Sequence, residues 1–175
     1  MYQAYIRNFA IASLLLMLGA CDSDSNNNIP PPPVLTPTQS YQVSILNLSY
    51  AQPLSPVVVI LHDSGFTGWT LGSAASEALE QLAEGGDNTA FLDSAAAMLM
   101  AGGEGIIMPG AAETLEVTID EMAEVQLTLV SMLVNTNDAF TGVTGADLTS
   151  LGIGESQMIE LPVYDAGTEA DQARG

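Results

Sequence analysis

An asparagine- and proline-rich stretch in the first quarter of the chain limits which residues can build a folded core. Three successive Asn residues occupy positions 26–28, and four successive Pro residues occupy positions 30–33. Consecutive prolines favour the extended polyproline II conformation, and the segment 21–40 has too few apolar side chains to pack a core. We therefore expect residues 21–40 to be a tether and residues 41–175 to be the folded domain.

The segment before this tether is typical of a bacterial secretion signal. Arg7 precedes a run of twelve residues, 9–20, that is apolar apart from Ser13 and Gly19. A helix of that length rises about 18 Å, which is short of the roughly 30 Å hydrocarbon core of a bilayer. We therefore expect residues 1–20 to be a signal peptide and not a membrane-spanning helix.

The end of the apolar run, Leu18-Gly19-Ala20-Cys21, resembles the lipobox of bacterial lipoproteins. The resemblance implies cleavage after Ala20, a diacylglyceryl thioether on Cys21 and a fatty acid such as palmitate on the freed amine. Because Cys21 is the only cysteine, the chain forms no internal disulfide. We expect a lipid anchor in the bacterial cell envelope, with the domain facing the periplasm or the cell surface. The alternative is a soluble exported protein with one incidental cysteine.

The charge of the chain excludes one class of partner. Asp and Glu number 21 against 2 Lys and Arg, which gives a formal net charge of −19, and none of the basic residues is Lys. Nucleic-acid binding by phosphate neutralisation needs a basic face, so this chain is not expected to bind nucleic acid. A hydrophobic content of 47% is too high for a disordered acidic tail. Both adaptation to a salty environment and cation binding explain so many acids.

Short apolar runs separated by turn residues predict a mainly β domain after the tether. Helical spacing of Ala and Leu predicts helices over residues 72–85 and 90–100, with Ser73 or Ser76 as the first cap. Strand patterns lie on both sides of these helices, at residues 41–48, 57–61, 105–108, 114–119, 125–134 and 157–164. This order favours an antiparallel β-sandwich with a short helical insertion over alternating βαβ units.

The sequence gives little support to the common enzyme sites. His62 follows an apolar strand, as in α/β-hydrolases, but it is the only histidine and the chain has no G-x-S-x-G motif. We expect His62 to form local hydrogen bonds at the strand end. One histidine and one cysteine also make a poor zinc site. The glycine-rich residues 102–105 lack the Lys of a P-loop, so no nucleotide is expected.

Two acidic loops that follow predicted strands are candidates for oxygen-rich metal binding. Residues 135–142 form the first loop and residues 164–169 the second. Calcium takes six to eight oxygen ligands, and strand-end loops at one edge of a sandwich can supply them. Asp165 and Glu169 are four residues apart, and Gly167 between them permits a turn. Solvated acidic loops without a metal would have the same spacing.

Four motifs in order resemble the spondin N-terminal domain family, over about residues 41–169. They are YQVSILNLSYAQPLSPVVV, GSAASEALEQLAEGG, SMLVNTNDAFTG and YDAGTE. The resemblance implies an eight-stranded antiparallel sandwich with one bound calcium ion, for which Asp138, Asp165 and Glu169 stand at the ligand positions. Animal members carry Trp at the position of Ala139 and Asp at that of Glu169. Members also continue into another strand, so we expect the domain of residues 41–175 to lack its last strand.

The resemblance also implies a function without catalysis. Animal spondin domains act in adhesion, so we expect a membrane-anchored, calcium-binding interaction module with a protein or glycan ligand. Two alternatives stay open. One is a metal-dependent periplasmic enzyme with His62 as its only histidine base, and the other is a structural envelope protein.

Overall fold

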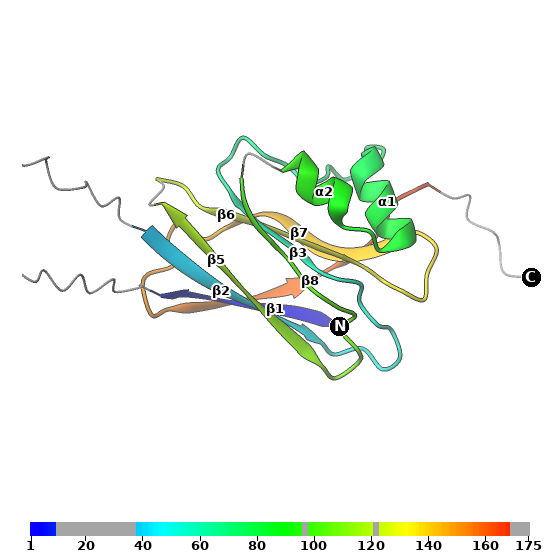
Figure 1. The fold of residues 1–175 in the computed structure, drawn as a ribbon, viewed down its shortest axis with the longest axis horizontal. Coiled ribbons are helices and arrows are strands. Elements are labelled where there is room, and N and C mark those ends of the chain that lie inside the picture. Colours follow the sequence, from blue (N-terminus) through cyan, green and yellow to red (C-terminus); the bar gives the residue numbers. More distant parts are fainter. Residues whose placement is uncertain (10–37, 96–97, 121–122, 169–175) are drawn as a thin grey trace, which may run out of the picture.

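Two antiparallel sheets pack face to face, and two short helices lie on the outer face of one of them (Figure 1). The computed structural model describes residues 1–9, 38–95, 98–120 and 123–168. The predicted fold class, a mainly β antiparallel sandwich with a short helical insertion, is confirmed. Most of the predicted tether and Cys21 lie outside the described residues.

The first sheet has the strand order β5-β2-β1-β8, and all its neighbours are antiparallel. Its strands are β1 (Tyr2–Phe9), β2 (Thr38–Asn47), β5 (Ala112–Asp120) and β8 (Ser156–Leu161). Along β2 the buried side chains of Tyr41, Val43 and Ile45 alternate with more exposed ones. This is the pattern of a strand with one face on the core, so the strand predicted at residues 41–48 is confirmed.

The second sheet has the order β4-β3-β6-β7-β9. Its strands are β3 (Val58–His62), β4 (Leu99–Gly102), β6 (Gln126–Met132), β7 (Ala139–Asp147) and β9 (Val163–Asp165). Every residue of β3 is buried, because the first sheet covers one face of β3 and the helices cover the other. The continuous apolar run at residues 57–61 therefore marks an interior strand, as predicted.

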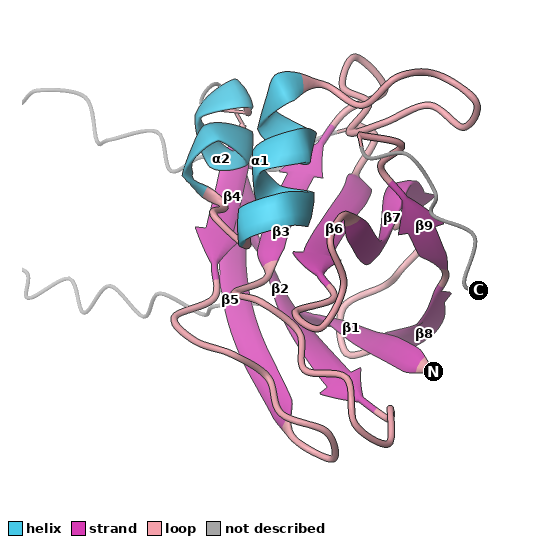
Figure 2. Ribbon diagram, turned by 90° about the vertical axis from the view of Figure 1, so that its right-hand side faces the viewer, coloured by secondary structure: helices cyan, strands magenta, loops and turns pink. Residues whose placement is uncertain are grey.

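The helices α1 (Glu77–Gly85) and α2 (Thr89–Ser94) pack on the outer face of the second sheet (Figure 2). Leu79 and Leu82 of α1 and Phe91 of α2 are buried there. Ser76 caps α1, since its hydroxyl accepts a hydrogen bond from the Leu79 amide at 3.2 Å. Among the described residues, neither helix has the length and apolar character needed to cross a membrane.

Both helices are shorter than the sequence predicts. Ser76 has an extended backbone, so α1 begins at Glu77 and not at residue 72. The second predicted helix ends at Ser94, and Leu99–Gly102 instead forms β4, which pairs with β3. A short apolar run fits a buried helix or a strand equally well, and here pairing with the open edge of β3 decides for the strand.

Three strand assignments also differ from the prediction. Strand β7 was not predicted and begins within the predicted loop 135–142, since its Thr- and Gly-rich sequence gives a weak strand signal. The predicted strand 157–164 divides into β8 and β9 at Pro162, which has no amide hydrogen for a ladder. In the predicted strand 105–108, only Ile107 forms a bridge, with Leu54.

Strand β1 is a further strand that the sequence analysis did not predict. Residues 2–9 belong to the predicted signal peptide 1–20, yet here they form an interior strand between β2 and β8. Their backbone pairs with strands that lie far along the chain, a contact that no local pattern records. Residues 10–20 lie outside the described part of the chain, and the signal peptide stays a prediction. The sandwich thus includes residues from outside the predicted domain of 41–175.

Gly142 generates a prediction about the close packing of β6 and β7. A Cβ at this position would collide with the Leu129 carbonyl oxygen and lie 3.0 Å from the Trp69 ring. We expect Gly142→Ala to lower the free energy of unfolding by about 1–3 kcal/mol, measured by urea denaturation. Gly105→Ala is the control, because no atom lies within 4 Å of its added Cβ. Equal stability of the two variants would contradict the packing seen here.

Candidate metal site

The two predicted acidic loops lie side by side in the structure. Asp138 ends the loop between β6 and β7, and Asp165 is the last residue of β9. Strand β9 pairs with β7 so that Ala139 stands opposite Asp165. The Ala166 amide donates a hydrogen bond to the Asp138 carbonyl oxygen at 3.0 Å. Backbone pairing therefore brings close together the backbones of two of the three predicted ligands, with Asp138 opposite Ala166 and Asp165 opposite Ala139.

Thr136 sets the shape of the β6–β7 loop. Its hydroxyl donates to the Leu133 carbonyl oxygen at 2.6 Å and accepts from the Ala139 amide at 3.3 Å. The Leu133 amide in turn donates to the Ala139 carbonyl oxygen at 2.8 Å, which closes the loop. Asn135 fixes the outer side through its side-chain amide, which donates to the Ala51 carbonyl oxygen at 3.0 Å. These bonds hold the backbone from which the Asp138 carboxylate extends.

The β9 loop turns sharply at Gly167, as its sequence predicts. The Asp165 carboxylate accepts a hydrogen bond from the Gly167 amide at 2.7 Å, and Gly167 has a φ of 71°, in the left-handed region. The turn brings the Thr168 hydroxyl to 3.5 Å from Oδ2 of Asp138. Sequence analysis did not single out Thr168, although its position between Asp165 and Glu169 was a usable signal. Glu169, the third predicted ligand, lies outside the described residues.

The side chains present at this site are hard oxygen donors. Asp138 is half-buried and Asp165 is exposed, so their carboxylates lie at a surface that an ion can reach. Carboxylate, hydroxyl and carbonyl oxygens are the ligands that calcium prefers. Within residues 1–9, 38–95, 98–120 and 123–168, no three His, Cys, Asp or Glu side chains are grouped to hold a metal ion. The donor chemistry fits calcium, and the predicted set of three needs Glu169.

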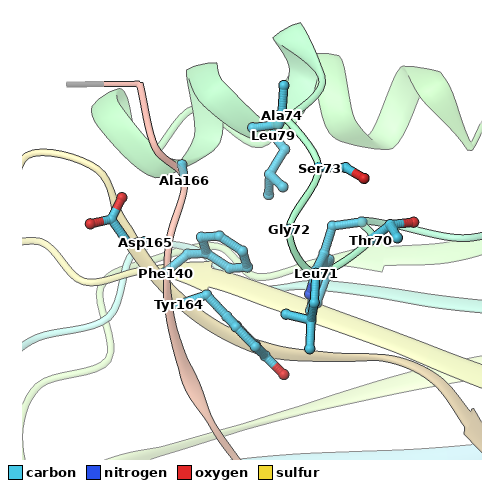
Figure 3. A pocket seen from close by; sticks show the side chains of 12 residues that line it. Thr70, Leu71, Gly72, Ser73, Ala74, Leu79, Phe140, Tyr164, Asp165 and Ala166 are labelled. Atoms are coloured by element: carbon cyan, nitrogen blue, oxygen red, sulfur yellow. The ribbon is translucent and has the colours of Figure 1, made fainter. Parts of the chain in front are cut away.

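An aromatic cluster lies directly behind the acidic loops. The Trp69 ring centroid is 5.2 Å from that of Phe140 and 5.6 Å from that of Tyr164. Phe140 directly follows Ala139 in the sequence, and Tyr164 directly precedes Asp165. Figure 3 shows the Asp165 carboxylate pointing away from the rings of Phe140 and Tyr164. The cluster therefore supports the backbone of the site and leaves the carboxylate outside.

A small cavity lies beside this cluster, under residues 69–75 (Figure 3). Its volume is about 60 Å³. Pockets that take small-molecule ligands usually measure about 300–1,000 Å³. The cavity has room for about two water molecules and is too small for a typical enzyme substrate.

His62 is buried and both of its ring nitrogens have partners. Nδ1 lies 2.6 Å from the Asp63 carbonyl oxygen, and Nε2 lies 2.8 Å from the Thr128 hydroxyl. This confirms the prediction that His62 forms local hydrogen bonds. His62 pairs with Gln126 at the start of β6, whereas Asp138 follows the end of β6. The histidine and the acidic loops therefore lie at opposite ends of the second sheet.

Comparison with known proteins identifies the family. The family model of the spondin N-terminal domain matches residues 47–173, a range that contains Asp138, Asp165 and Glu169 and begins after strand β1. A search of curated proteins gave no match. The matched range covers most of the chain and includes both acidic loops, the helices and all strands of the second sheet. The chain therefore belongs to the spondin N-terminal domain family.

Proposed function

We propose that this protein is a calcium-stabilised binding module without catalytic activity, anchored to a bacterial envelope membrane through a lipid on Cys21. The observation that supports the calcium assignment is the backbone pairing of β7 with β9, which sets the loop that ends at Asp138 beside the loop that begins at Asp165. Glu169 completes the proposed ligand set. The binding partner of the protein is another protein or a glycan.

A metal ion at this position would act as a cross-link between two strands. Strand β9 has only three residues and, within the described part of the chain, stands at the edge of its sheet and pairs with β7 alone. Ligands from Asp138 on one side and from Asp165 and Glu169 on the other would fasten this edge strand. Since the ion binds the folded state only, it stabilises the fold by mass action. The net charge of −19 also favours cation binding.

The placement of His62 supports a binding function over metal-dependent catalysis. Hydrolysis assisted by a metal needs a base close to an open coordination position. Both ring nitrogens of His62, a buried residue, are hydrogen-bonded, and His62 lies at the other end of β6 from Asp138. The small cavity next to Tyr164 also offers little room for a substrate.

Calcium should raise the melting temperature of the full chain carrying Cys21→Ser. At a calcium concentration 100 times the Kd, binding adds about 2.7 kcal/mol, or roughly 5–10 °C for a protein of this size. Asp138→Asn should remove most of this increase, because it replaces a charged ligand. Differential scanning calorimetry with calcium and with a chelator measures both effects.

The matched control for this experiment is Asp93→Asn, the same chemical change at an exposed position on α2. We expect this variant to keep the full calcium response. An unchanged melting curve of the parent protein over millimolar calcium would refute the metal assignment. An equal loss in the two variants would indicate general charge screening and no specific site.

Trp69 provides a spectroscopic test of where calcium binds. It is the only tryptophan, and it contacts Phe140 and Tyr164, which flank the acidic loops. We expect a saturable change in its fluorescence on calcium titration, with a midpoint that matches the calorimetric affinity. Asp93→Asn should preserve the change and Asp138→Asn should weaken it. A calcium-induced rise in melting temperature with no change in emission would place the ion elsewhere.

The lipid anchor is tested separately on Cys21. In a bacterial host with lipoprotein-processing enzymes, the chain should incorporate radiolabelled palmitate and partition with the membrane fraction. Cys21→Ser should abolish both, because a hydroxyl does not accept the diacylglyceryl group. Mass spectrometry of the N-terminal peptide should then find the modified residue only in the parent protein. Labelling that persists in the variant would contradict the assignment.

A further inference from the structure

Strand β1 fills a slot between two strands that come from distant parts of the chain. All eight of its residues pair with β2, and six also pair with β8. Both pairings are antiparallel (β1 is the dark blue strand in Figure 1). Among the described strands of the first sheet, β8 has no neighbour other than β1. The segment 2–9 therefore pairs along its whole length with β2 and along residues 2–7 with β8.

The inward side chains of β1 define what the slot accepts. Tyr2, Ala4, Ile6 and Asn8 are buried, and the residues between them are exposed or half-buried. The first three belong to the core between the sheets, in the order large, small, large. The slot thus selects an extended segment by alternation and by side-chain size.

The last inward position is not fully matched by its present occupant. The side-chain amide of Asn8 donates to the Leu151 carbonyl oxygen at 2.8 Å. Its Oδ1 atom is buried without a hydrogen-bond partner in the described part of the chain. A buried acceptor with no partner is unfavourable, so another side chain at this position can fit better.

The walls of the slot have attachments that do not involve β1. Nine residues of β2 pair with β5 on its other side. The C-terminal end of β8 is held by the Thr141 hydroxyl, which lies 3.2 Å from the Leu161 carbonyl oxygen and donates to that of Pro162 at 2.7 Å. Removal of β1 would leave unpaired backbone groups on β2 and β8, and such edges bind strands readily.

We propose that the β2/β8 slot is a binding site for an extended peptide strand, filled here by the chain's own residues 2–9. The ligand is a segment of another polypeptide that runs antiparallel to both walls, with aliphatic or aromatic side chains at alternate positions and a small residue at the second. Exposure of the site in the cell rests on the proposed lipoprotein processing, since cleavage after Ala20 removes β1. The leader then occupies the binding site until the protein is exported.

The test uses the full chain with Cys21→Ser and a protease recognition sequence inserted between Asp24 and Ser25. Cleavage separates the β1 fragment from the domain without removing it. We expect the fragment to co-elute with the domain in gel filtration. A fluorescent peptide with the sequence of residues 2–9, added in excess, should replace it and show a rise in anisotropy.

Two variant peptides form a matched pair. Ile6→Asp places a carboxylate at a buried inward position, so the affinity of this peptide for the domain should fall by about tenfold or more. Tyr5→Asp makes the same charge change at the adjacent outward position, where the side chain is 42% exposed. Its affinity should stay within about twofold of the parent peptide, as expected for a surface site.

Three outcomes would overturn the proposal. The first is loss of the fragment, by dissociation or aggregation, with no binding of the added peptide. The second is an equal fall in affinity for the two variant peptides. The third is dimerisation of the cut protein in a form that does not bind the peptide. The experiment needs neither calcium nor a lipid on residue 21. Failure of the calcium or palmitate tests therefore leaves the exchange result intact, and failure of exchange leaves those two assignments intact.

Discussion

Strand β7 makes the close approach on which the candidate site depends. Gly142 allows the β7 backbone to contact the Leu129 carbonyl of β6, and its own amide donates to the Pro162 carbonyl oxygen at 3.2 Å, just before β9. With β7 fixed on both sides, Ala139 pairs with Asp165. The backbones of Asp138 and Asp165 then lie next to each other at one edge of the sheet. A side chain at residue 142 would separate these strands and move the acidic loops apart.

The remaining polar groups near this sheet serve the fold. His62, Thr128 and Thr144 form a chain of hydrogen bonds on the helix-covered face of the second sheet, with the last two hydroxyls 3.2 Å apart. The Thr144 hydroxyl also accepts from the Gly68 amide at 2.9 Å, which fixes the segment that leads to Trp69. Buried polar groups of this kind stabilise a fold when they are fully paired. The single histidine therefore helps to place the aromatic cluster that supports the acidic loops.

Local patterns predicted part of the fold well. The alternation in β2 and the β-branched run in β3 were correct, because each reflects the exposure of neighbouring residues on one strand. Strand β7 was missed because its Thr and Gly residues carry little apolar signal. In the site, Asp138 and Asp165 were chosen by motif and their loops lie side by side, whereas Thr136 and Thr168 were missed. Their roles depend on hydrogen bonds to residues whose positions the sequence does not reveal.

The sequence alone determined the mainly β class, the family motifs, the positions of the acids and the lipobox-like end at Cys21. Tertiary structure decided which strands are neighbours. It placed residues 2–9 inside a sheet, although a proline-rich segment separates them from the other strands in the sequence. It also set the backbone of Asp138 next to that of Asp165. The physical reason is that the alternation of apolar and polar residues along a strand reflects which of its faces packs on the core. Strand order follows from backbone hydrogen bonds between distant segments, which any extended segment with matching alternation can form.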